Sequence, residues 1–193
     1  MTRRRLETKV DIPTSKESWR PCLLPGPLVL VSSVSSRGEA HAARKSWITM
    51  VSSRPPMLLF GCRLSHRTAI NVLETREFVV NIPGDSLAAR IRNAGDAAQE
   101  TSSVDEDPGW TWGPSRKIAT PRILECRGHV ECTLESTRRL NEEDLVFFAT
   151  IVAVSADESL LQGAPEDRYQ ALRSMLQLEE GLIAVVDRAI KVP

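Results

Sequence analysis

The stretch AHAARKSWITMVSSRPPMLLFGCRLSHRTAINVLETREFVVNIP, residues Ala40–Pro83, decides the fold that the sequence predicts. The apolar run Met57–Gly61 predicts a buried strand, and a polar segment over 63–68 follows it directly. Apolar residues at helical spacing come next, and Phe78–Ile82 is typical of a second buried strand. The polar segment therefore connects a strand to the start of a helix.

That position gives the polar segment a possible chemistry. A helix start has free backbone N–H groups and the positive end of the helix dipole. Ser65 is a candidate N-cap, and Arg67 and Thr68 fall in the first turn. Helix starts usually carry Asp or Glu, so a first turn with Arg67 and no carboxylate suits an external anion such as a phosphate. An ordinary capped surface helix accounts for the same residues equally well.

The composition is that of a globular domain. The chain has 193 residues, of which 41% are hydrophobic and 26% are charged, as in ordinary soluble proteins. We expect an N-terminal arm over 1–20 and one domain over 21–193. The 25 basic and 25 acidic residues cancel, so the charge gives no indication of nucleic acid or an anionic membrane as a partner. No apolar stretch suits a membrane span and the N-terminus lacks a secretory pattern, so we expect a cytoplasmic protein.

The four cysteines form no C-x-x-C pair. Cys126, His129 and Cys132 have a spacing that could suggest a metal site. Their segment alternates like a strand, which would turn His129 to the face opposite the two cysteines. The sequence therefore predicts no metal site here.

Strand patterns dominate the rest of the chain. A hairpin is expected over 28–50, strands over 123–134 and 145–157, a helix over 168–178 and a last strand after Gly181. The segment over 95–115 is long for a loop, so it is either functional or partly mobile. This order favours a mainly β protein, a small antiparallel barrel with a few peripheral helices, over a parallel doubly wound sheet.

Common catalytic motifs are missing from the sequence. It has no nucleotide-binding glycine pattern, no zinc-protease motif and no nucleophile elbow, and only three histidines. These absences argue against hydrolases and metalloenzymes. Catalysis in this chain would depend on a bound cofactor.

Residues Pro27–Pro83 resemble the flavin reductase-like family, whose members bind FMN in a split β-barrel with Greek-key-like strand order. The segment LVLVSSVSSRGEAHAA is similar to the family's opening hairpin, and KSWITMVSSRPPMLLFG to its A-P-x-S-[FW] segment and following strand. The segment CRLSHRTAINVLETREFVVNIP carries the most specific match, to S-x-x-[KR]-x-T-x-x-N-x-x-x-x-x-E-F-V-V-N-[LI]. Arg44 stands where the family often has proline.

The resemblance implies a cofactor site. Ser65, Arg67 and Thr68 would hold the FMN phosphate. The ribityl chain and isoalloxazine ring would lie along Ala43, Lys45, Ser46 and Trp47, with Ser46 donating a hydrogen bond to the ring edge. Trp47 either stacks near the ring or belongs to the core.

Two further residues have alternative roles. His66 either reaches the phosphate or faces solvent. Asn81 either contacts the cofactor or ties adjacent strands together, and the second role is favoured.

The resemblance also implies an activity. The leading hypothesis is an FMN-dependent oxidoreductase that takes hydride from NADH or NADPH, although no nicotinamide-binding motif is visible. A flavin-binding electron carrier and a pyridoxamine-phosphate-oxidase-like enzyme are the alternatives, and FAD could replace FMN. A homodimer is expected, with a monooxygenase or another acceptor as the electron partner.

Overall fold

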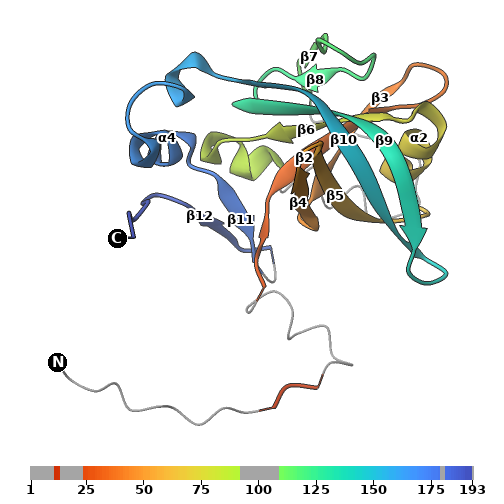
Figure 1. Cartoon of the computed structure of the whole chain (residues 1–193), viewed down its shortest axis with the longest axis horizontal. Helices are drawn as coiled ribbons and strands as arrows, with labels where there is room; N and C mark the ends of the chain where they lie inside the picture. Colours follow the sequence, from red (N-terminus) through yellow and green to blue (C-terminus); the bar gives the residue numbers. More distant parts are fainter. Residues whose placement is uncertain (1–10, 14–23, 92–108, 179–180, 193) are drawn as a thin grey trace.

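The protein is described by a computed structural model of residues 11–13, 24–91, 109–178 and 181–192 (Figure 1). Its strands are β1 (Gly26–Pro27), β2 (Val29–Val34), β3 (Ala40–Lys45), β4 (Ile48–Ser53), β5 (Pro56–Arg63), β6 (Glu77–Ile82), β7 (Trp112–Gly113), β8 (Arg122–Ile123), β9 (Gly128–Arg139), β10 (Asp144–Ala156), β11 (Met175–Gln177) and β12 (Ile183–Val185). Its helices are α2 (Arg67–Thr75), α4 (Pro165–Leu172) and the single 3₁₀ turns η2 (Asp85–Leu87) and η3 (Glu158–Leu160).

One antiparallel sheet of seven strands makes the barrel. The strand order is β3-β2-β6-β9-β10-β5-β4, so β3 and β4 are its two edges. Among the described residues no ladder joins these edges, and the barrel is split between them. The predicted mainly β antiparallel barrel with peripheral helices is confirmed.

Aromatic rings fill the centre of the barrel. Alternation along β5 turns Leu58, Phe60 and Cys62 inward. Phe60 stacks on Phe147 with ring centroids 4.7 Å apart, and Phe78 meets Phe60 edge-on at 4.9 Å. Each such pair adds about 0.5–1.5 kcal/mol beyond the burial of its apolar area. This core holds β5, β6 and β10 in fixed positions.

Helix α2 connects β5 to β6 and packs against β2, β3 and β5. In Figure 1 it lies on the side of the barrel away from the β11–β12 hairpin. It buries Thr68, Ala69, Asn71 and Val72, and it ends at Arg76, whose φ is 64°. The Arg76 guanidinium donates to the carbonyl of Leu134 at 2.7 Å, which fixes the end of the helix to β9.

A second core lies outside the barrel. Leu28 and Leu30 pack there with Ile91, Trp110, Ile123, Cys126 and Met175. The small sheet β1-β11-β12 flanks this core. It joins the beginning of the domain to the C-terminal hairpin.

Three expectations need correction or fall outside the described residues. The predicted strand over 123–134 is interrupted, because a turn with a Cys126 N–H to Ile123 carbonyl bond precedes β9. The predicted helix over 168–178 is α4, which ends at Leu172 before a left-handed Arg173, and β11 follows it. Most of the 95–115 segment lies outside the described residues.

The cysteine pattern forms no metal site within the described ranges. Cys132 lies in the barrel core, whereas Cys126 lies in the second core. No group of three possible metal ligands gathers anywhere in that part of the chain. The expectation that the two cysteines share one face of a strand is wrong, because the turn before β9 separates them.

None of the described helices is both long enough and apolar enough to cross a membrane.

Candidate functional site

The first turn of α2 carries no acidic residue of its own. Arg67 and Thr68 are the first two residues of the helix, as predicted. His66 is the N-cap, not Ser65, because His66 has the extended backbone that precedes the helix, with φ −74° and ψ 137°. No side chain caps the helix, so its first N–H groups keep the capacity to bind an anion.

Thr68 has a buried hydroxyl at this helix start. Its side chain is fully buried, and within the described residues its Oγ1 has no hydrogen-bond partner. Buried hydroxyls are normally paired, so an orphaned one is a candidate ligand contact. Ser65 is exposed on the preceding turn.

Arg67 contacts a carboxylate from another element. Its Nη2 lies 3.3 Å from Oε2 of Glu39, in the turn between β2 and β3. The side chains of this pair are 41% and 54% exposed, so the contact is weak and open to competition by a stronger anion.

Lys45, at the end of β3, also lies near the start of α2, on the interior side of the barrel. It is 9% exposed, and its Nζ donates to Cys62 Sγ at 3.2 Å. Nδ1 of His66 lies 3.5 Å from the Lys45 Nζ and 3.7 Å from Cys62 Sγ. These contacts join β3 to β5 across the split in the barrel. The side chain of Lys45 therefore lies at the start of α2.

The positive charges act on the nearby histidines. Burial, followed by Arg67, Lys45 and His66, lowers the pKa of His41 to about 4. Burial lowers the pKa of His66 too, with further contributions from Lys45 and Arg63 against an opposing one from Asp144. Both imidazoles are therefore neutral near pH 7.

Cys62 responds in the opposite direction. Burial raises the pKa of its thiol, although the neighbouring Lys45 works against this shift. The thiol is thus a neutral neighbour of the Lys45 ammonium.

Ser46 and Trp47 form the tight connection between the sheet edges β3 and β4. The N–H of Gly61 donates to the carbonyl of Trp47 at 2.8 Å, and a Cβ at Gly61 would lie 3.1 Å from the indole. A Cβ at Gly26 would overlap the carbonyl oxygen of Ser46. Glycines on β1 and β5 therefore fix this connection from two sides.

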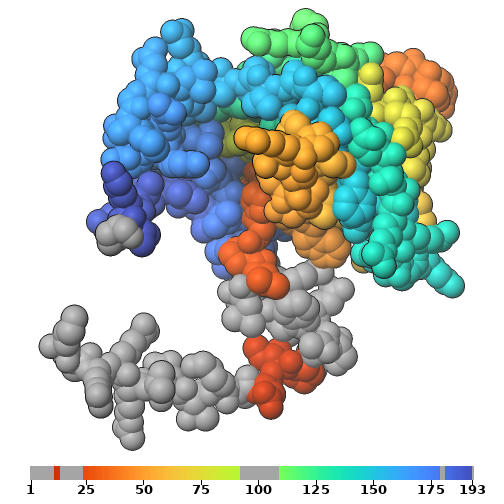
Figure 2. All heavy atoms as spheres, in the orientation of Figure 1, coloured from red at the N-terminus to blue at the C-terminus, as the bar shows by residue number. Residues whose placement is uncertain are grey.

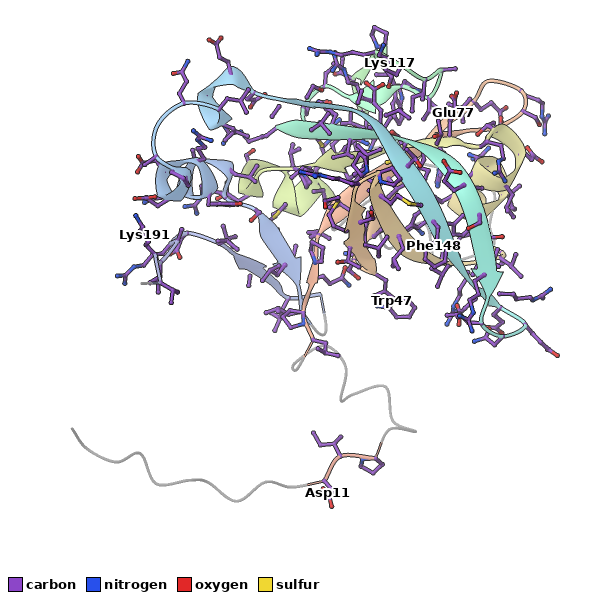
Figure 3. The ribbon with its side chains drawn as sticks, viewed as in Figure 1. Asp11, Trp47, Glu77, Lys117, Phe148 and Lys191 are labelled. Carbon is purple, nitrogen blue, oxygen red and sulfur yellow. The ribbon has the colours of Figure 1, made fainter. Side chains whose placement is uncertain are left out.

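A cavity of about 500 Å³ opens at this connection. Its walls include Ser46, Trp47, Cys62, Leu140, Asp144 and Val146. Trp47 is 51% exposed, so the structure does not place it in the core, and Figure 3 shows it projecting from one end of the barrel. The size and apolar walls of the cavity suit a planar ligand.

Asn81 lies away from this cavity, inside a paired network. Its Nδ2 donates to the carbonyl of Leu30 at 3.1 Å and to Ser32 Oγ at 3.0 Å. Its Oδ1 accepts the N–H of Ile123 at 2.9 Å and faces Nδ1 of His129 at 3.1 Å. These contacts support the strand-tying role of Asn81.

Unlike Asn81, the predicted residue Ala43 lies near the site. It is a buried residue of β3, one position before Arg44.

Three residues at the site have no counterpart in the sequence-based prediction. Cys62 contacts Lys45 and Glu39 contacts Arg67, whereas His41 is the group on which the charges of Arg67 and Lys45 act. Alternation along β5 could have indicated that Cys62 faces inward. No local pattern could show that it meets Lys45.

Family comparison identifies a known domain over most of the chain. A family model described as a flavin reductase like domain matches residues 22–172. The match spans the whole seven-stranded sheet, α2 and α4.

Solved structures with the same architecture cover nearly the full chain. Nitrilotriacetate monooxygenase component B from Bacillus cereus is 21% identical, with a TM-score of 0.83 over 97% of this chain and 100% of that one. 2-Nitrobenzoate 2-nitroreductase from Pseudomonas fluorescens is 22% identical, with a TM-score of 0.82 over 96% and 95% of the two chains. Flavoredoxin from Methanosarcina acetivorans is also 22% identical, with a TM-score of 0.80 and the same coverage. At these identities the likeness establishes the fold.

Proposed function

The chain belongs to the flavin reductase-like domain family, and from this premise we propose that it is a flavin-dependent oxidoreductase. We place the phosphate of FMN at the start of α2 and its ring at the connection between β3 and β4. NADH or NADPH is the proposed electron donor.

The helix start carries this proposal. It combines an uncapped first turn without acidic residues, the unpartnered Oγ1 of Thr68 and the cations Arg67 and Lys45. A phosphate oxygen can accept hydrogen bonds from the hydroxyl of Thr68 and from the helix N–H groups while Arg67 balances its charge. The residues present therefore fit the phosphate end of FMN.

The other end of the site suits the ring. Ser46 and Trp47 are held rigidly by Gly61 and border the cavity of about 500 Å³. When bound, the flavin would supply the redox chemistry, by accepting hydride from NADH or NADPH. The protein would orient the two rings and limit the access of water, and no acidic or basic side chain is required at the transferred hydrogen.

An anaerobic titration tests the proposal. FMN is added to the purified protein and its visible spectrum is recorded before and after stoichiometric NADH, and then NADPH. We expect FMN to bind and its absorbance to bleach with one of the two nucleotides. Binding without bleaching would leave an electron carrier with another reductant, and absence of binding would overturn the cofactor assignment.

We also propose that the protein is a homodimer. A groove of about 730 Å³ lies on the barrel surface, lined almost entirely by apolar residues of β2, β4, β5, β6, β9 and β10. Met50 and Val154 in this groove are 57% and 63% exposed, and Figure 2 shows β4 (orange) standing out on the molecular surface. Ile48 and Thr49 line both the groove and the ring cavity, so a second copy seated here would border the ring site.

Molecular mass in solution, measured by light scattering, tests the dimer. Val154→Asp should dissociate it, because a buried carboxylate would have no partner in an apolar interface. Leu161→Asp is the matched control, since Leu161 is also 63% exposed but does not line the groove. A monomeric wild type, or equal effects of the two variants, would contradict this interface.

A further inference from the structure

Lys45 is a buried cation whose neighbours are both uncharged at neutral pH. Its contacts are the thiol of Cys62 at 3.2 Å and Nδ1 of His66 at 3.5 Å. Within the described part of the chain it makes no ion pair with any carboxylate. Burying an ammonium without a counter-charge is costly, so this arrangement needs a reason.

The position of Lys45 increases this cost. Its neighbour His66 is the N-cap of α2, where the positive end of the helix dipole lies. Arg67 follows at the first helical position. The carboxylate of Asp144, on β10, acts weakly on Cys62 and His66 through its charge and does not form an ion pair with Lys45. Lys45, Arg67 and the positive end of the helix dipole therefore lie close together, and the carboxylate in contact with them among the described residues is the exposed one of Glu39, which pairs with Arg67.

We propose that Lys45 is the buried cation of an anion site and that it binds the flavin phosphate, not the ring. Arg67 supplies the exposed positive charge at this site and Lys45 the interior one. The inference rests on the proposed function and assigns Lys45 a place that differs from the one implied by the family resemblance. The ligand-free protein gives up stability for this charge and recovers it when a phosphate is bound.

The test compares FMN with riboflavin, which has the same ring and no phosphate. Lys45→Met keeps the length of the side chain and removes its charge. We expect the dissociation constant for FMN to rise tenfold or more and that for riboflavin to change less than twofold. We also expect the ligand-free variant to melt at a higher temperature than wild type, and FMN to raise its melting temperature less.

Relative to wild type, the melting temperature of the ligand-free variant should rise and the further increase caused by FMN should shrink. The loss of a lysine with a purely structural role would not produce this combination. Lys117→Met is the control, because Lys117 is an exposed lysine that contacts Glu131 only through its backbone. It should leave both dissociation constants and both melting temperatures as in wild type.

A second variant keeps the lysine in place. Cys62→Asp would put a carboxylate beside Nζ, where the thiol now lies at 3.2 Å. It should compete with the phosphate and weaken FMN binding at least tenfold, with riboflavin binding retained. This variant tests the proposal even if Lys45→Met does not fold.

Several results would overturn the inference. Equal loss of FMN and riboflavin in Lys45→Met would place Lys45 at the ring, and an unchanged ratio of the two constants would make it structural. A wild type that binds neither flavin would contradict the proposed function, and inorganic phosphate alone then serves as the probe. Phosphate should raise the melting temperature of wild type more than that of Lys45→Met, and equal shifts would refute the anion site itself.

Discussion

Glu131 and Lys45 are both charged side chains that the fold buries, but they differ in what surrounds them. Glu131, on β9, is 1% exposed, and its carboxylate accepts the N–H groups of Arg116 at 2.8 Å and Lys117 at 2.7 Å. Lys45, on β3, is 9% exposed and faces a thiol and an imidazole. One buried charge is matched by its own chain, whereas the other is not.

The difference separates a structural role from a binding role. Glu131 belongs to a group of polar side chains that hold the 109–127 segment against the sheet, and Glu77 joins it by accepting the N–H of Ala119 at 2.8 Å. Figure 3 shows Glu77 and Lys117 near one another, away from Trp47. Polar groups that are paired within the protein stabilise it, whereas unpaired ones at a cavity are available to a ligand.

We expect the largest effect on stability from removing the paired charge of Glu131. Glu131→Gln replaces one acceptor oxygen with an amide that meets a backbone N–H, so we expect the free energy of unfolding to fall by about 3 kcal/mol. Urea denaturation measures this loss. Glu142→Gln, at an exposed carboxylate, should change stability by less than about 0.5 kcal/mol. Similar losses in the two variants would remove the contrast between Glu131 and an ordinary surface residue.

Asn81 tests the same contrast between a structural and a binding role, because it is a predicted site residue that is paired within the protein. Asn81→Ala leaves the Ile123 N–H and the His129 imidazole without their partner, at a cost of about 2–3 kcal/mol in unfolding free energy. Because those contacts lie away from the proposed ring and phosphate, the FMN dissociation constant should stay within twofold of wild type. Weakened FMN binding in a folded variant would restore Asn81 to the cofactor site.

Arg67 tests the binding side of the comparison. Arg67→Ala should weaken FMN binding by about 1.5–3 kcal/mol, because a charge-assisted contact to the phosphate is lost. Glu39→Gln should act in the opposite direction, since it removes the carboxylate that lies 3.3 Å from the Arg67 guanidinium. Titration of FMN by fluorescence measures both changes. An unchanged dissociation constant in Arg67→Ala would exclude this residue from the phosphate site.

The smallest effect concerns the pH dependence of stability. Burial and nearby cations lower the pKa of His41 and of His129 from 6.5 to about 4. Between these values the unfolded chain binds more protons than the folded one, so stability is complete above pH 6.5 and decreases as the pH falls towards 4. Because neither ring is completely shielded from solvent, which screens its charge, the loss between pH 7 and pH 5 should be about 1 kcal/mol for each histidine.

Urea denaturation at the two pH values checks this slope. His41→Gln should flatten it, because one of the histidines with a lowered pKa is gone. An identical slope in wild type and variant would show that His41 does not contribute to it.

Local patterns account for the barrel but not for its site. Alternation identified β5 and β6, and the polar segment identified the start of α2, because both signals lie within a few residues. The contact between Lys45 and Cys62 joins the edge strand β3 to β5, which is next to the other edge strand, and only the curling of the sheet into a barrel brings them together. The end of α4 was missed because Arg173 adopts a left-handed backbone with φ 48°, with no glycine or proline to mark it.

Gly26 links the C-terminal hairpin to the ring cavity. It pairs with Gln177 on β11, and any side chain at position 26 would collide with Ser46. Removal of the residues after α4 would therefore free β1 from its partner strand and change the packing around Ser46, which is far away along the chain. Expression tags and truncations for this protein should be planned accordingly: shortening the C-terminus is a change to the wall of the cavity, and flavin content would report it before any loss of solubility.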